Sequence, residues 1–173
     1  MAHEHSIYDC DTHFVIDPVT RQIKNESGKT VIVQNDHNSE RFTCELPRTV
    51  EGHDMSACDK VEVLYENVKA SDKTKHFNRY IVTDFKIDPE DESKVILSWL
   101  ITDDATQNVG NLNFSVRFYC ETNFVWNTAI FSEIKVIQGM PKTSDMVASP
   151  EEELAEIENL IDESGVIERD NNL

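Results

Sequence analysis

The sequence predicts an all-β protein, an antiparallel β-sandwich of jelly-roll-like type followed by a short C-terminal amphipathic helix. The first observation is a strict alternation from Leu112 to Cys120, in which every second residue is apolar and its neighbours are polar or mixed. A period of two is typical of a strand with one buried face. Similar short runs recur from residue 12 to 137 with polar turns between them, the second observation. The third is that no helical pattern interrupts these runs, which disfavours an α/β fold.

Each expected strand ends where a turn is favoured or a sheet hydrogen bond is impossible. Pro18 and Pro47 each follow a run, and a proline cannot donate to a ladder. The run 94–101 is apolar on both faces, which indicates a central strand. Glu51–Asp59 is expected to be irregular, with room for one helical turn. The expected strands are 12–17, 31–34, 41–46, 61–65, 77–87, 94–101, 112–120 and 124–137. The last range is expected to be one strand or a bent pair of strands, with Trp126, Ile130 and Phe131 pointing inward.

The pattern changes after residue 140. Ser149 is an expected N-cap, Pro150 suits the first helical position, and Glu152 completes a capping box. The helix carries an apolar stripe, which needs a partner: its own domain, another protein, or copies of itself in a short coiled coil. The stripe comprises Leu154, Ile157, Leu160 and Ile161. The expected organisation is a flexible N-terminus (1–11), a sandwich domain (12–140), a linker (141–148), the helix (149–165) and a disordered tail (166–173).

The charge balance narrows the classes of partner. The 173 residues include 16 Lys and Arg against 33 Asp and Glu, a net charge of −17. Such a chain is a poor match for nucleic acid or for anionic membrane surfaces, because both need clustered cations. No apolar run approaches the roughly 20 residues of a membrane span, and no signal peptide is recognisable, so we expect folding in a cytosol. The four scattered cysteines are therefore expected to be reduced thiols.

No catalytic motif, cofactor motif or metal signature is recognisable in the sequence. His3, His5, Cys10 and His13 lie close together but match no zinc spacing. The cluster Asp88–Glu92 is interpreted as an acidic turn rather than a calcium site, because it lacks the EF-hand pattern. Trp99 and Trp126 lie in apolar patterns, which favours core packing over stacking on sugars.

A Ser/His/Asp arrangement could be drawn from two polar loops. One loop holds Asp36, His37 and Ser39, and the other holds His53 and Asp54. Neither has the strained turn that exposes a nucleophile in hydrolases. Hydrogen bonding within turns is the simpler explanation for Asn35, Asp36 and their neighbours. We therefore expect no enzyme.

Several stretches along the chain carry a resemblance as an ordered set. The stretches are DPVTRQI (17–23), QNDHNSE (34–40), EGHDMS (51–56) followed by KVEV (60–63), VTDFKIDPED (82–91) and AIF (129–131). No single one of these motifs is diagnostic. Together they resemble the N-terminal domain of the baseplate upper protein family of tailed phages and prophages of Gram-positive bacteria, and the resemblance covers roughly residues 8–140.

The resemblance implies a β-sandwich that attaches to the tail-tip hub, in particular to a distal tail protein ring. In that family a helical segment follows and leads to receptor-binding proteins or adhesin domains. The expected protein is thus a virion component of the tail or baseplate, forming a homo-oligomer, made and assembled in the host cytoplasm, without catalytic residues or cofactor. The expected interface residues are Asn35, Asp36, His37, Glu51, His53, Asp54 and the stripe Leu154, Ile157, Leu160 and Ile161.

One alternative stays open at this level. A carbohydrate-binding module that recognises host cell-wall glycans would have the same fold class and the same lack of catalytic motifs. It would need an exposed aromatic platform or a polar, calcium-assisted site. Exposure of Trp99 or Trp126 in the folded protein would favour it.

Overall fold

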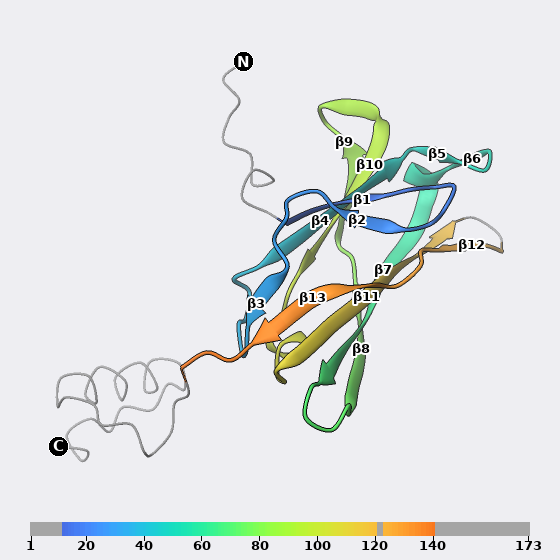
Figure 1. Ribbon diagram of the computed structural model, residues 1–173. Helices are drawn as coiled ribbons and strands as arrows, with labels where there is room; N and C mark the ends of the chain where they lie inside the picture. Colours follow the sequence, from blue (N-terminus) through green and yellow to red (C-terminus); the bar gives the residue numbers. More distant parts are fainter. Residues whose placement is uncertain (1–11, 121–122, 141–173) are drawn as a thin grey trace, which may run out of the picture. The chain divides into compact units, whose positions relative to one another are not determined.

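The computed structural model describes residues 12–120 and 123–140, which form a β-sandwich of two facing sheets (Figure 1). The all-β fold class is confirmed, and helix is confined in this part of the chain to short 3₁₀ turns, among them η2 (Met55–Ala57) and η3 (Asp103–Ala105). No described helix is both long and apolar enough to cross a bilayer. The predicted flexible N-terminus, linker, amphipathic helix and tail lie outside the described residues.

The first sheet has five strands. Its order is β2 (Ile23–Asn25), β1 (Thr12–Ile16), β4 (Arg41–Pro47), β10 (Asp91–Leu100) and β9 (Asp84–Asp88). The predicted central strand is confirmed, because β10 lies between β4 and β9 and its residues 95–99 are all buried. All neighbours are antiparallel except β1 and β4, which run parallel.

The second sheet has six strands and carries the alternating run. Its order is β3 (Val31–Val33), β13 (Phe131–Ile137), β11 (Gly110–Cys120), β7 (Cys58–Lys69) and β8 (Lys75–Ile81), with β12 (Phe124–Asn127) also paired to β11. The pair β3–β13 is parallel, so both sheets depart at one place from the antiparallel pattern. A small ribbon of β5 (Thr49–Val50) and β6 (His53–Asp54) connects β4 to η2.

The core lies between the sheets and is built largely from aromatic rings. The predicted inward row of β11 is confirmed: from Leu112 to Cys120 every second residue is no more than 2% exposed. Phe114 of β11 lies 5.3 Å from Phe14 of β1, ring centre to ring centre, and 5.3 Å from Trp99 of β10. These tilted and edge-on contacts join the two sheets. Burial of Trp99 and Trp126, each 1% exposed, confirms that both tryptophans are core residues.

Two sequence expectations about strands were wrong. Residues 77–87 do not form one strand, because the chain leaves β8 of the second sheet and enters β9 of the first at residues 82 and 83. The alternation continues through this crossing without glycine or proline, so no stop signal marks it. Ile130 is not inward but 67% exposed. Between β12 and β13, Thr128 is buried instead, and its hydroxyl accepts a hydrogen bond from the Val116 amide (2.9 Å).

The expectation of four reduced cysteines was also wrong. Cys58 at the start of β7 and Cys120 at the end of β11 are paired across neighbouring strands and form a disulfide. Cys44 is a buried free thiol, and burial raises its pKa to about 12. Scattered spacing gave no sign of the pair, since the two residues lie 62 positions apart and only the strand register brings them together.

Candidate interaction site

The six expected interface residues of the sandwich do not form one surface. Strand β4 separates them, because the loop with Asn35, Asp36 and His37 precedes this strand and the β5–β6 ribbon with Glu51, His53 and Asp54 follows it. We call the end with residues 34–40 and 101–109 the lower end, and the end with the β5–β6 ribbon and the β1–β2 turn the upper end (Figure 1). A combined Ser/His/Asp site from both loops is therefore absent from the described fold.

At the lower end the expected turn residues mainly hold two loops together. Asn35 has a left-handed backbone (φ 70°), and its amide donates to the Thr106 carbonyl (3.0 Å). Nδ1 of His37 accepts a hydrogen bond from the Asp103 amide (3.1 Å). These contacts join two loops, and the expected hydrogen bonding within the turn is seen at the Asp36 amide, which donates to the Val33 carbonyl (3.1 Å).

The same end holds a partly buried polar network around Asp104. Its carboxylate accepts hydrogen bonds from the Tyr65 hydroxyl (2.5 Å), from Asn78 (2.6 Å) and from Thr102. Partial burial alone would raise the pKa of Asp104, but these hydrogen bonds outweigh it and lower the pKa. Burial and the neighbouring carboxylate raise the pKa of Tyr65. The network ties η3 to β7 and β8.

At the upper end, charged and aromatic side chains from three separate segments meet. The Arg21 guanidinium lies 3.0 Å from the Glu51 carboxylate and stacks 4.8 Å from the centre of the Trp126 ring. The Trp126 indole N–H donates to the same carboxylate (3.1 Å). His53 stacks on Phe124, with ring centres 3.6 Å apart. The β5–β6 ribbon is thus fixed against β12 and the β1–β2 turn.

Asp54 completes the ribbon as a cap. Its carboxylate accepts from the amide and the hydroxyl of Ser56 (3.0 and 2.6 Å), at the start of η2, and pairs with Arg48 (3.1 Å). The hydrogen bonds from Arg48 and Ser56 lower the pKa of Asp54 to about 2. The residue acts as an N-cap, a role that its position before a short helical turn makes recognisable.

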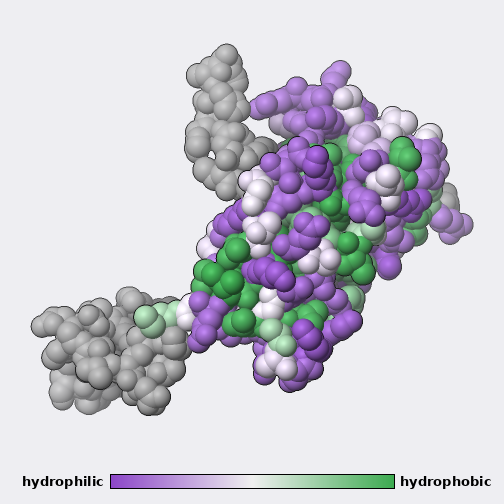
Figure 2. All heavy atoms as spheres, in the orientation of Figure 1, coloured by the Kyte–Doolittle hydropathy of each residue, from purple (hydrophilic) through white to green (hydrophobic). Residues whose placement is uncertain are grey.

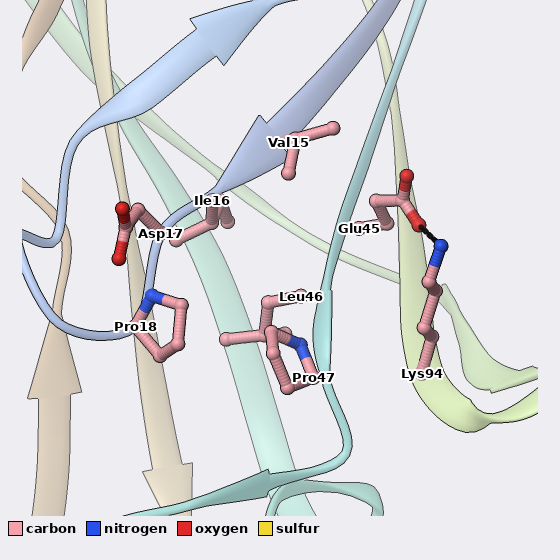
Figure 3. A pocket seen from close by; sticks show the side chains of 8 residues that line it. All are labelled: Val15, Ile16, Asp17, Pro18, Glu45, Leu46, Pro47 and Lys94. Carbon is pink, nitrogen blue, oxygen red and sulfur yellow. Dashed lines mark ion pairs between the residues drawn. The ribbon is translucent and has the colours of Figure 1, made fainter.

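A pocket opens beside this end, where the parallel strands β1 and β4 finish (Figure 3). Val15, Pro18 and Pro47 give it apolar walls, and the pair of Glu45 and Lys94 (3.0 Å) stands at its rim. We call it the proline pocket. The sequence analysis used both prolines as strand ends and missed that neighbouring parallel strands would bring them together.

A second apolar feature lies on the outer face of the second sheet. Phe77 and Ile130 are 66% and 67% exposed and flank a shallow groove, whose floor includes Leu64, Asn113 and Ser115. We call this the outer groove. Figure 2 shows that hydrophobic side chains reach the surface in patches between hydrophilic ones. Exposed apolar side chains point to a contact surface where they gather in one patch, and Phe77 and Ile130 line the same groove.

The expected histidine cluster and acidic turn do not gather into a metal-binding group in the described residues. Among residues 12–120 and 123–140, no three His, Cys, Asp or Glu side chains gather as a metal-binding group. His13 of the N-terminal cluster bonds to Glu45 (3.0 Å). In the acidic turn, Asp88 accepts from the Glu90 amide (2.9 Å) and Asp91 from the Ser93 amide (3.0 Å), as expected of a turn.

Comparison with known proteins identifies a similar fold and no family. No family model and no curated protein matches the chain. Among solved structures, the chain is similar to one described as the N-terminal domain of phage TP901-1 ORF48, at 14% identity and a TM-score of 0.46. The likeness covers 75% of this chain and 98% of that one. A likeness of this size carries no conclusion about function.

Proposed function

We propose that this protein is a non-enzymatic structural component of a phage virion, located in the tail or baseplate. In this proposal its upper end docks on the tail hub, and the chain positions proteins for host adsorption. The expected partners are a distal tail protein, further copies of the chain and, more remotely, receptor-binding proteins. The ordered stretches that resemble the baseplate upper protein family support the assignment to a phage virion.

One observation carries the proposal: stretches of that resemblance far apart in sequence meet at the upper end around Arg21. Arg21 belongs to the stretch 17–23, and its carbonyl accepts a hydrogen bond from Ala129 (2.9 Å) of the stretch 129–131. Its side chain pairs with Glu51 (3.0 Å) of the stretch 51–56. A shared surface is the simplest physical reason for such residues to occur together.

The β1–β2 turn at this end is built for contact. Two backbone amides, of Val19 and Thr20, donate to the Asp17 carboxylate (2.8 and 3.2 Å) and lower its pKa. The turn therefore holds its shape while the Val19 side chain remains 87% exposed. A rigid turn that presents an apolar side chain next to the proline pocket fits a protein partner, because little entropy is lost on binding.

The sugar-binding alternative loses its main support. Trp99 and Trp126 are each 1% exposed, so neither provides a stacking platform in the described fold. At the upper end, His53 and Phe124 stack on each other, so the stacked face of each ring is not available to a sugar.

Light scattering with the distal tail protein of the same phage tests the docking surface. We expect a stoichiometric complex with the wild-type chain, and at least about tenfold weaker binding for Val19→Asp, which places a charge in an apolar contact. Val109→Asp is the matched control, because Val109 is also exposed but lies at the lower end. Equal binding of both variants would contradict docking through the upper end.

A further inference from the structure

Strand β8 is an open edge of the second sheet. It pairs with β7 on one side only, through an unbroken register from Val68 opposite Lys75 to Glu62 opposite Ile81. Six of its seven residues are exposed, and the seventh, Tyr80, is partly buried. The Arg79 amide donates to the side-chain oxygen of Asn78 (2.8 Å), a local bond that an incoming strand would replace. An edge of this length otherwise presents a row of backbone groups that can pair with another strand.

Two of the usual protections of an edge strand, a proline and a bulge, are missing from β8. It contains no proline, and its pairing with β7 has no bulge. Its two outward cations are held by carboxylates of β7: Lys75 lies 3.9 Å from Glu66, and Arg79 lies 3.3 Å from Glu62. Because the side chain of Glu62 is only 2% exposed, its charge is directed at this pair rather than at solvent. The edge is therefore close to electrically neutral, although the chain is strongly acidic.

The other described edges differ in this respect. Strands β2 and β3 have three residues each, and β12, which pairs with β11 alone, has four; such short edges offer little to a partner strand. Strand β9 joins β10 through an irregular register between Asp91 and Val95, and irregular edges twist away from partners. The long, regular and neutral edge is β8.

We propose that β8 pairs with β8 of a second copy, in antiparallel orientation about a two-fold axis at Asn78. This register places Phe77 of each copy opposite Arg79 of the other, and Lys75 opposite Ile81. An arginine against an exposed aromatic ring is an attractive pair, and here it occurs twice. The outer grooves of the two copies, each flanked by Phe77, would lie next to the joint. The inference names the surface through which the expected homo-oligomer forms, and to that extent it rests on the proposed function.

Charge gives the pairing a distinctive salt dependence. Each copy carries a net charge of −17, which opposes association over long range. Added salt screens that long-range repulsion, whereas the backbone hydrogen bonds, apolar contacts and Arg79–Phe77 pairs of the joint act at short range and are screened less. Self-association should therefore strengthen as salt rises. An acidic segment bound by Lys75 and Arg79 would show the opposite trend.

Analytical ultracentrifugation over a range of protein and salt concentrations tests the inference. We expect a dimer that strengthens with salt, and at least about a hundredfold weaker association for Phe77→Lys, because the substitution occurs twice in the dimer. Ile137→Lys is a control on a different strand of the same sheet, at 44% exposure. Hub binding, measured separately, should be unchanged in Phe77→Lys, so loss of the dimer and loss of docking are distinguishable.

Hydrogen exchange of the wild-type chain supplies a second test that needs no variant. The amides of β8 should gain protection as the protein concentration rises, while those of β3 should not. A monomer at all concentrations, association that weakens with salt, or association without protection of β8 would each overturn the inference.

Discussion

The guanidinium of Arg21 lies 3.0 Å from the carboxylate of Glu51, and both residues have left-handed backbone conformations (φ 66° and 51°). Such conformations are costly for residues with a side chain, so they persist only where the surroundings hold them. Here the pair joins the β1–β2 turn to the β5–β6 ribbon, and the Trp126 indole N–H donates to the same carboxylate (3.1 Å). The upper end is thus fixed by a shared acceptor.

Removal of that acceptor should loosen the upper end. We expect Glu51→Ala to lower the free energy of unfolding by about 1 kcal/mol, because Trp126 loses the acceptor of its N–H and Arg21 loses its ion pair. Glu51→Gln keeps an acceptor oxygen and should recover most of the loss. Urea unfolding monitored by tryptophan fluorescence measures both variants, and an equal effect of the two would contradict this role.

Gly110 is the glycine that the fold depends on most. Its φ is +153°, and an added Cβ would lie 1.9 Å from the Val68 carbonyl oxygen of the neighbouring strand. We expect Gly110→Ala to cost more than about 3 kcal/mol or to prevent folding, because backbone atoms cannot move aside. Gly28→Ala is the control, since a Cβ added at Gly28 (φ +78°) would meet nothing within 4 Å, and this substitution should cost only about 1 kcal/mol. Thermal unfolding of the two variants measures both losses of stability, and equal losses would contradict the role of Gly110.

The disulfide should be detectable by its chemistry. In denaturant without reductant, an alkylating reagent should label Cys44 and leave Cys58 and Cys120 unlabelled. Reduction should then expose both and lower the stability by about 2–4 kcal/mol, the usual contribution of such a link. Labelling of all three residues without reductant would restore the sequence-based expectation of free thiols.

Asp54 should give the upper end a defined response to acid. Its pKa is 3.8 in the unfolded chain and about 2 in the fold, so the folded state binds the proton less readily. The stabilisation is fully present above pH 3.8 and is lost as the pH falls toward 2. The stability difference between wild type and Asp54→Asn should therefore shrink over that interval. Asp59→Asn serves as an exposed control, and a difference that stays constant with pH would contradict the capping role.

The sequence predicted individual strands well, but it did not predict how the strands pair and cross between the sheets. The alternation of β11 predicted its buried row, because period-two burial is a local property. The crossing at residues 82 and 83, by contrast, depends on which sheet each half can enter. The parallel pairing of β1 with β4 and the Cys58–Cys120 link likewise depend on register, which no local pattern records.

The candidate site shows the same division. Glu51, His53 and Asp54 were singled out from their motif and do lie together at the upper end. Asn35, Asp36 and His37 lie at the other end, because their motif serves a loop-to-loop connection. The proline pocket and the outer groove needed the fold, since each combines side chains from strands that are distant in sequence.

The most direct test of a virion role is quantitative mass spectrometry of purified phage particles from the strain that encodes this chain. The proposal predicts that the chain is present in several copies, at a fixed ratio to the distal tail protein, and remains with tails after heads are removed. Absence of the chain from purified particles, with normal amounts in the lysate, would contradict a structural role in the tail.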